Sequence, residues 1–138
     1  MKRSMRYVFD TNVIVSALLF NSSKPAQALR YALENGELLL SLDLLEELNE
    51  VLERERFSRY VTSEEREEFL DVLVERAALV EIVETVEECR DRKDDKLLEL
   101  ALNGQAQYII TGDRDLLVLH PFRAVAVITV DAFLRQHL

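Results

Sequence analysis

Tyr7-Val8-Phe9-Asp10-Thr11-Asn12 is the stretch that decides the fold, because it changes from apolar to polar at one point. Residues 6–9 are short, apolar and rich in the types that favour strands. The three polar residues that follow are typical of the end of a strand and the start of a helix. Residues 13–20 then continue as an apolar segment. The stretch therefore predicts a buried strand that leads directly into a helix.

The same alternation continues along the chain. Further strands are predicted at residues 38–41, 79–83, 108–111 and 124–128, and helices at residues 26–34, 94–103 and 130–138. Two more helices are predicted, one behind a capping box of Asp43 and Glu46 and one capped by Thr62 or Ser63. Strands that alternate with helices favour βαβ units. The sequence thus predicts an α/β fold, with helices on both faces of a central parallel sheet of about five strands.

The composition fits a single domain over residues 1–138, with 49% hydrophobic and 31% charged residues. One cysteine, Cys89, excludes a disulfide within the chain and favours a reducing, cytoplasmic setting. Neither a signal-peptide core nor an apolar run of the roughly 20 residues that cross a bilayer is present, so no membrane association is expected.

Four acidic residues fall where a parallel α/β sheet binds its ligands. Asp10 follows the first predicted strand and Asp113 the fourth, so both are expected at the carboxyl edge of the sheet. Glu47 borders the apolar stripe of its helix. Asp94 is in register with the inward face of its own helix, whereas Asp95 is rotated away by about 100°. The four carboxylates are therefore predicted to project toward one place.

Carboxylates packed together repel one another and lose hydration, so such a cluster is expected to take up protons or bind a cation. Oxygen ligands without histidine or cysteine favour Mg²⁺ or Mn²⁺ over zinc. Ions held in this way suit the hydrolysis of phosphodiesters. The chemistry predicted from these residues is metal-assisted phosphoryl cleavage.

The quoted stretch, the Glu47-Leu48 helix, Asp94 and the run Thr111-Gly112-Asp113-Arg114-Asp115-Leu116 resemble, in this order and spacing, the PIN domain. The closer likeness is to the small single-domain VapC-like toxins of toxin-antitoxin pairs. The resemblance extends over essentially the whole chain. It implies a three-layer, Rossmann-like PIN fold and a Mg²⁺- or Mn²⁺-dependent endoribonuclease.

The resemblance also implies roles for particular residues. The family's metal-binding and catalytic acids match Asp10, Glu47, Asp94 and Asp113, with Asp115 as a fifth candidate metal ligand. Asn12 and Thr111 match its supporting polar residues. Asp95, beside Asp94, stays open as an alternative ligand. The implied partners are an RNA substrate, a small antitoxin protein and a second copy of the chain in a homodimer.

Other interpretations stay open. Each aspartate could simply cap a helix or form a turn. A phosphatase of the haloacid-dehalogenase type would use Asp10 as nucleophile, but it needs a second aspartate where this chain has Asn12. A module of the same fold could also bind RNA or protein without cleaving anything.

The net charge of −9 argues at first against an RNA partner. Residues 43–88, however, hold 16 acidic and five basic residues, whereas the rest of the chain holds ten acidic and 12 basic ones. We therefore expect RNA at the edge that carries the candidate metal ligands, where the flanking bases are Lys24, Arg90, Arg92, Lys93, Lys96 and Arg114.

Overall fold

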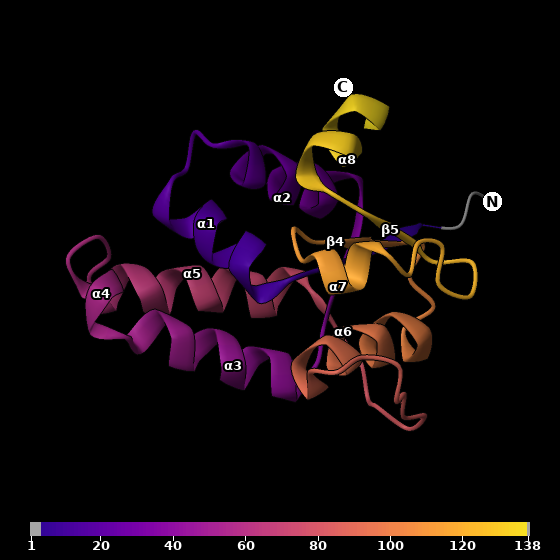
Figure 1. Ribbon diagram of the computed structural model, residues 1–138. Coiled ribbons are helices and arrows are strands. Elements are labelled where there is room, and N and C mark those ends of the chain that lie inside the picture. Colours follow the sequence, from indigo (N-terminus) through magenta and orange to yellow (C-terminus); the bar gives the residue numbers. More distant parts are fainter. Residues whose placement is uncertain (1–3, 138) are drawn as a thin grey trace.

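The computed structural model describes residues 4–137 and contains the predicted parallel sheet (Figure 1). All neighbouring strands are parallel, and their spatial order is β3-β2-β1-β4-β5. The strands are β1 (Met5–Phe9), β2 (Gly36–Leu40), β3 (Ala78–Leu79), β4 (Tyr108–Ile110) and β5 (Ala126–Ile128). The strand order reverses beside β1, so the loops after β1 and β4 open next to each other.

Helices lie on both sides of this sheet, which makes the three layers of the predicted fold (Figure 1). They are α1 (Thr11–Leu19), α2 (Lys24–Asn35), α3 (Leu42–Glu53), α4 (Glu55–Ser58), α5 (Ser63–Arg76), α6 (Arg92–Asn103), α7 (Arg114–Leu117) and α8 (Val130–His137). Figure 1 shows α2 and α8 on one side of the sheet and α5 and α6 on the other. The four-residue helices α4 and α7 were not among the predicted elements.

The central strands are buried because neither of their faces meets water. The last three residues of β1 and of β2 are all at most 1% exposed. This near-continuous apolar character is typical of parallel strands that are covered on both faces. It explains why short runs without alternation identified β1, β2 and β4 in the sequence.

An aromatic cluster joins α8 to the sheet. Phe133 of α8 is fully buried, and its ring lies 5.6 Å from that of Tyr7 on β1 and 5.9 Å from that of Tyr108 on β4, measured between centroids. Tyr31 of α2 packs edge-on against the same phenylalanine at 5.7 Å. One side chain thus connects two helices with two central strands.

Helix caps differ in part from the predicted ones. The Ser41 hydroxyl, not Asp43, caps α3 by accepting from the Leu44 N–H at 3.1 Å. The predicted capping box of Asp43 and Glu46 is therefore wrong, because α3 begins two residues earlier than that cap implies, at Leu42. At α5 the Thr62 cap is confirmed, since Thr62 and Glu65 form a reciprocal capping box.

The predicted third strand at residues 79–83 is also wrong in its extent, because pairing with β2 covers only Ala78 and Leu79. After the Val80 N–H donates to the Leu40 carbonyl, the chain leaves the sheet. Residues 83–89, which we call the strap, bond instead to polar side chains of α6. These side-chain acceptors take the place of a strand partner.

The acceptors on α6 are Asn103, Glu99 and Asp95, spaced four residues apart on one helix face. Asn103 accepts from the backbone N–H groups of residues 83 and 84, Glu99 from that of residue 86, and Asp95 from those of residues 88 and 89, all at 2.8–2.9 Å. Glu99 also pairs with Arg92 at 2.7 Å. This ladder fixes the chain that enters α6.

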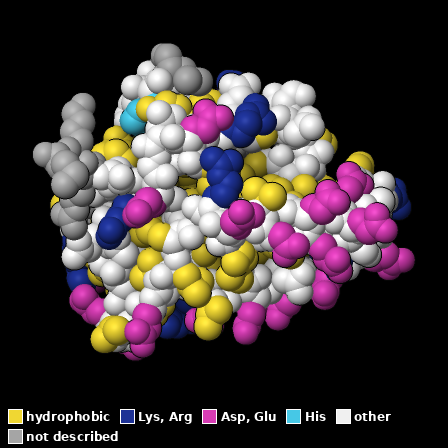
Figure 2. Space-filling view, turned by 180° about the vertical axis from the view of Figure 1, so that it is seen from behind, with side chains coloured by type: hydrophobic (Ala, Val, Ile, Leu, Met, Phe, Trp, Pro, Cys, Tyr) yellow, Lys and Arg dark blue, Asp and Glu magenta, His cyan; other side chains and the backbone are white. Residues whose placement is uncertain are grey.

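Acidic side chains gather at the end of the molecule that carries α3 to α5 (Figure 2). The exposed acids of α5 are Glu64, Glu65, Glu67, Glu68, Asp71 and Glu75.

No helix within residues 4–137 is long and apolar enough to cross a membrane.

Candidate metal centre

Asp10 and Asp113 stand at the ends of the neighbouring strands β1 and β4, as predicted. Thr111 joins them: its hydroxyl donates to Asp10 Oδ2 at 2.7 Å and accepts from the Asp113 N–H at 3.0 Å. Thr111 is fully buried. The structure therefore places Thr111 as a support for both acids.

Both aspartates also cap the helices that follow them. Asp10 Oδ1 accepts from the Asn12 N–H at 3.3 Å, and Asp113 Oδ1 accepts from the Asp115 N–H at 2.9 Å. Capping and a place in the acidic cluster are thus not alternatives here. The caps hold the two carboxylates at the carboxyl edge of the sheet.

α6 supplies the third acid. It begins at Arg92, two residues before the predicted start, because Asp91 caps it by accepting from the Lys93 N–H. Asp94, in the first turn, is 7% exposed. One carboxylate oxygen each from Asp94, Asp113 and Asp115 lie within 4.8 Å of one another, a spacing that could hold a metal ion.

The neighbouring Asp95 is equally buried but turns toward the strap, where it accepts from two backbone N–H groups. Burial alone would raise the pKa of its carboxyl, but these hydrogen bonds outweigh burial, and the pKa of Asp95 lies below its ordinary value. Burial and the Asp95 carboxylate raise the pKa of the Cys89 thiol to about 12, so little of the nucleophilic thiolate forms at neutral pH. The geometry thus separates the two adjacent aspartates: only Asp94 belongs to the cluster with Asp113.

A cavity of about 350 Å³ gathers the candidate residues from four parts of the chain. Glu47 enters it from α3 and Asn12 from α1. Its lining consists of Asp10, Thr11, Asn12, Glu47, Val51, Arg54, Arg56, Asp91, Lys93, Asp94, Leu97 and Asp113. The four acids predicted to converge therefore do share one cavity, and Asp115 lies beside it, half-exposed and 3.4 Å from Arg90.

Mutual repulsion shows in the pKa values of the acids. Burial, the Asp113 carboxylate and a hydrogen bond to Asp113 raise the pKa of Asp94 to about 7. Burial also raises the pKa of Glu47, and Asp10 adds to this rise, although Lys93 opposes it. Burial and the neighbouring carboxylates thus disfavour the charged forms of Asp94 and Glu47.

No ion pair within the described residues reaches Asp10, Glu47, Asp94 or Asp113. Three of the six bases expected beside them pair with other acids: Lys24 with Asp131, Arg92 with Glu99, and Lys96 with Asp43. Arg90 pairs with Asp115. Lys93 does line the cavity. Residues that sequence reasoning missed are Asp91, Arg54 and Arg56; the spacing of Glu47, Val51 and Arg54 on one helix face was the available signal.

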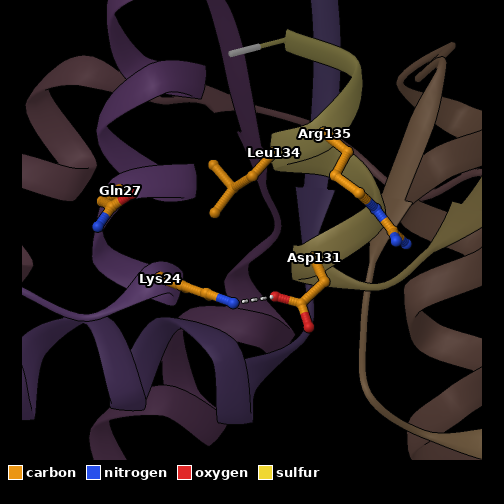
Figure 3. A pocket seen from close by; sticks show the side chains of 5 residues that line it. All are labelled: Lys24, Gln27, Asp131, Leu134 and Arg135. Atoms are coloured by element: carbon orange, nitrogen blue, oxygen red, sulfur yellow. Dashed lines mark ion pairs between the residues drawn. The ribbon is translucent and has the colours of Figure 1, made fainter.

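A second hollow, of about 480 Å³, lies between α2 and α8 (Figure 3). It is lined by Lys24, Gln27, Asp131, Leu134 and Arg135. Its one acid, Asp131, forms a 3.0 Å ion pair with Lys24, and both side chains are exposed. This hollow lacks the grouped, unpaired carboxylates of the cavity around Asp94. The cavity around Asp94 is therefore the candidate metal centre.

The fold and this centre together define a parallel α/β protein with an acidic cluster at the carboxyl edge of its sheet. The family model of the PIN domain matches residues 6–115, and the chain belongs to the PIN domain family. No curated protein matches the chain significantly.

Two solved structures share the fold. One is a chain of VapBC2 from Rickettsia felis bound to a DNA fragment from their promoter, with a TM-score of 0.61 and 15% identity over 91% of this chain and 98% of the other. The second is PAE2754 from Pyrobaculum aerophilum, with a TM-score of 0.65 and 16% identity over 96% of this chain and 88% of the other. At these identities the likeness concerns the fold.

Proposed function

We propose that this PIN domain protein is a Mg²⁺- or Mn²⁺-dependent endoribonuclease. The observation that carries the proposal is the cluster itself: carboxylate oxygens of Asp94, Asp113 and Asp115 lie within 4.8 Å of one another, beside a cavity that Asp10 and Glu47 also line. Among residues 4–137, Arg90 pairs with Asp115, but no ion pair reaches Asp10, Glu47, Asp94 or Asp113. A cluster of this kind in a PIN domain is best explained by a catalytic metal.

The residues present fit such an ion. Asp10, Glu47, Asp94 and Asp113 would hold it, and Asp115 would join from the edge of the cavity. Carboxylate ligands without histidine or cysteine are those that Mg²⁺ and Mn²⁺ prefer. When bound, the ion supplies Lewis acidity toward a phosphodiester and lowers the pKa of water.

The remaining residues orient this set. Thr111 holds Asp10 through a 2.7 Å hydrogen bond and fixes the backbone at Asp113, and Asn12 is exposed and lines the cavity. The Asp95–strap contacts fix the start of α6 and with it the position of Asp94. Metal ligands held by such hydrogen bonds keep their geometry when the ion leaves.

Fluorescently labelled RNA tests the activity. The protein is expected to cleave it with Mn²⁺ and not with EDTA, and Asp10→Asn and Asp113→Asn should each lower the rate by about 100-fold or more, because each removes a charged ligand. The measurement is product formation on a denaturing gel. Glu64→Gln, an exposed acid of α5, is the matched control and should cleave like the parent.

Absence of cleavage by the parent, or unchanged cleavage by both aspartate variants, would contradict the nuclease. The first outcome would leave a PIN domain that binds RNA or protein without cutting it. Calorimetry with Mn²⁺ tests the metal site separately from cleavage, because loss of a metal ligand must weaken binding of the ion whether or not RNA is cut.

We further propose that the protein is the toxin of a type II toxin-antitoxin pair, acting as a homodimer and held inactive by a small antitoxin. The shared fold with a chain of VapBC2 supports this role. Expression of the parent in a bacterial host should arrest growth, and expression of the Asp10→Asn variant should not. Equal growth of both cultures, with both proteins present at the same level, would contradict a toxin.

A further inference from the structure

Two exposed arginines that line the acidic cavity have no carboxylate partner among residues 4–137. Arg54 and Arg56 both line the cavity that holds Asp94 and Asp113. Neither forms an ion pair with any residue between 4 and 137. Arginines that served to neutralise the acids would lie within about 4 Å of them. These two therefore present their charge to the cavity and to solvent.

The fold holds both arginines in place. α3 ends where the Arg54 N–H donates to the Val51 carbonyl at 3.2 Å, and the Arg54 carbonyl accepts from the Phe57 N–H at 2.9 Å to begin α4. The Arg56 guanidinium lies over the Phe57 ring, 4.8 Å from its centroid. The bend between α3 and α4 thus carries two cationic side chains to the cavity mouth.

Their distance from the acids follows from the helix. Glu47 and Val51 line the cavity from one face of α3, and Arg54, which caps the C-terminus of this helix, lines it three residues further on. Seven residues of α-helix span roughly 10 Å along the axis. Arg54 therefore begins about 10 Å along the helix axis from Glu47, and among residues 4–137 no ion pair joins it to an acid of the cavity. A second anionic group, further along a bound chain, is the partner that fits Arg54 and Arg56.

We infer that Arg54 and Arg56 form a phosphate-binding subsite, which holds the RNA strand at a phosphate next to the one positioned at the acidic cluster. This rests on the proposed nuclease function. Arginine suits the role because its planar fork binds phosphate oxygens in pairs. An acidic peptide would meet the same carboxylates and the same ion, so RNA is favoured here by the proposed nuclease function, which places a phosphodiester at the acids.

Fluorescence anisotropy with a fluorescein-labelled single-stranded oligoribonucleotide and Mn²⁺ tests the subsite. All proteins carry Asp10→Asn, which keeps the RNA intact during titration. Arg54→Gln and Arg56→Gln should each weaken binding by about tenfold. The double variant should reduce the slope of log K against log salt by about 1.4, because each lost phosphate contact on a single strand is worth about 0.7.

Arg59→Gln is the matched control. Arg59 ends α4, is exposed and does not line the cavity, so its removal changes the net charge equally but should leave RNA affinity within about twofold of the parent. The subsite is overturned if the double variant binds RNA with the parent's affinity and salt slope, or if Arg59→Gln weakens binding as much as Arg54→Gln. Loss of binding to polyglutamate without loss of binding to RNA would overturn it in favour of a protein ligand.

The nuclease and the subsite can fail separately. RNA binding that depends on Arg54 and Arg56, in a protein that never cleaves, would support the subsite and contradict the nuclease. Cleavage by the protein with Asp10 intact, combined with unchanged RNA binding by the double variant, would support the nuclease and contradict the subsite.

Discussion

Replacing Asp94 by asparagine is expected to stabilise the metal-free protein at pH 8 while it abolishes Mn²⁺-dependent cleavage of RNA. In the fold the pKa of Asp94 rises from 3.8 to about 7, chiefly through burial and the Asp113 carboxylate. Above pH 7 the folded protein must therefore hold a buried charge against its neighbours. Asparagine has the same shape without the charge, so the variant should gain about 2–4 kcal/mol in free energy of unfolding in EDTA.

The sign of the pH dependence follows from the direction of the shift. Below about pH 4 the carboxyl is protonated in both the folded and the unfolded chain, so it contributes no penalty. Between about pH 4 and 7 the folded chain retains a proton that the unfolded chain has lost, so stability contributed by this group falls as the pH rises. Above pH 7 the penalty is complete. Urea unfolding in EDTA at pH 5.5 and pH 8 should show this fall in the parent and little of it in Asp94→Asn.

Asp95→Asn is the matched control, because it changes the adjacent residue in the same way with the opposite expected result. Asp95 accepts hydrogen bonds at 2.8 and 2.9 Å from the strap, which hold the pKa of its carboxyl below the ordinary value despite burial. Its charge therefore stabilises the fold at pH 8 and loses that effect as the pH falls through the acid range. Asp95→Asn should be less stable than the parent at pH 8. Destabilisation of equal size by both variants would contradict the assignment of Asp94 to the cluster.

Asp10, Asp113 and Asp94 could be located from the sequence because their positions depend on regular structure. Asp10 directly follows one apolar strand and Asp113 comes three residues after the end of another, and parallel strands end at one edge of a sheet. Asp94 lies in register with the buried face of a regular helix, so helical periodicity was enough to orient it. The same periodicity brought Glu47 to the border of its apolar stripe, and the structure places it in the cavity.

The burial of Asp95 could not be predicted from helical periodicity. Its angle on α6 predicted a side chain turned away from the core, but the strap folds over that face and buries it. The strap has no regular secondary structure, so no periodic pattern in the sequence predicts where it lies. The cap at Ser41 and the rim position of Arg56 were missed for a related reason. Both depend on the residue at which a helix begins or ends, and a shift of one residue along a helix turns the direction of the side chain by about 100°.

Phe133→Ala is expected to destabilise the fold by about 3–5 kcal/mol without touching the acidic cavity. The Phe133 ring is fully buried and contacts the rings of Tyr7, Phe9, Tyr31, Tyr108 and His137, with centroids 4.6–6.2 Å apart. Alanine would leave a cavity among rigid rings that cannot close around it, and α8 would lose its main contact with β1 and β4. The thermal midpoint should fall by about 10–20 °C.

Phe20→Ala removes the same side chain from a site that is 55% exposed, and it should change the free energy of unfolding by no more than about 0.5 kcal/mol. If Phe133→Ala does not fold at all, Phe133→Leu, which retains most of the buried surface, should fold with a smaller loss. Equal thermal midpoints for Phe133→Ala and Phe20→Ala would show that the aromatic cluster does not hold α8 to the sheet. Because the cluster lies apart from Asp94 and Asp113, folded Phe133 variants should bind Mn²⁺ like the parent at low temperature, which separates the stability of the fold from the integrity of the candidate metal centre.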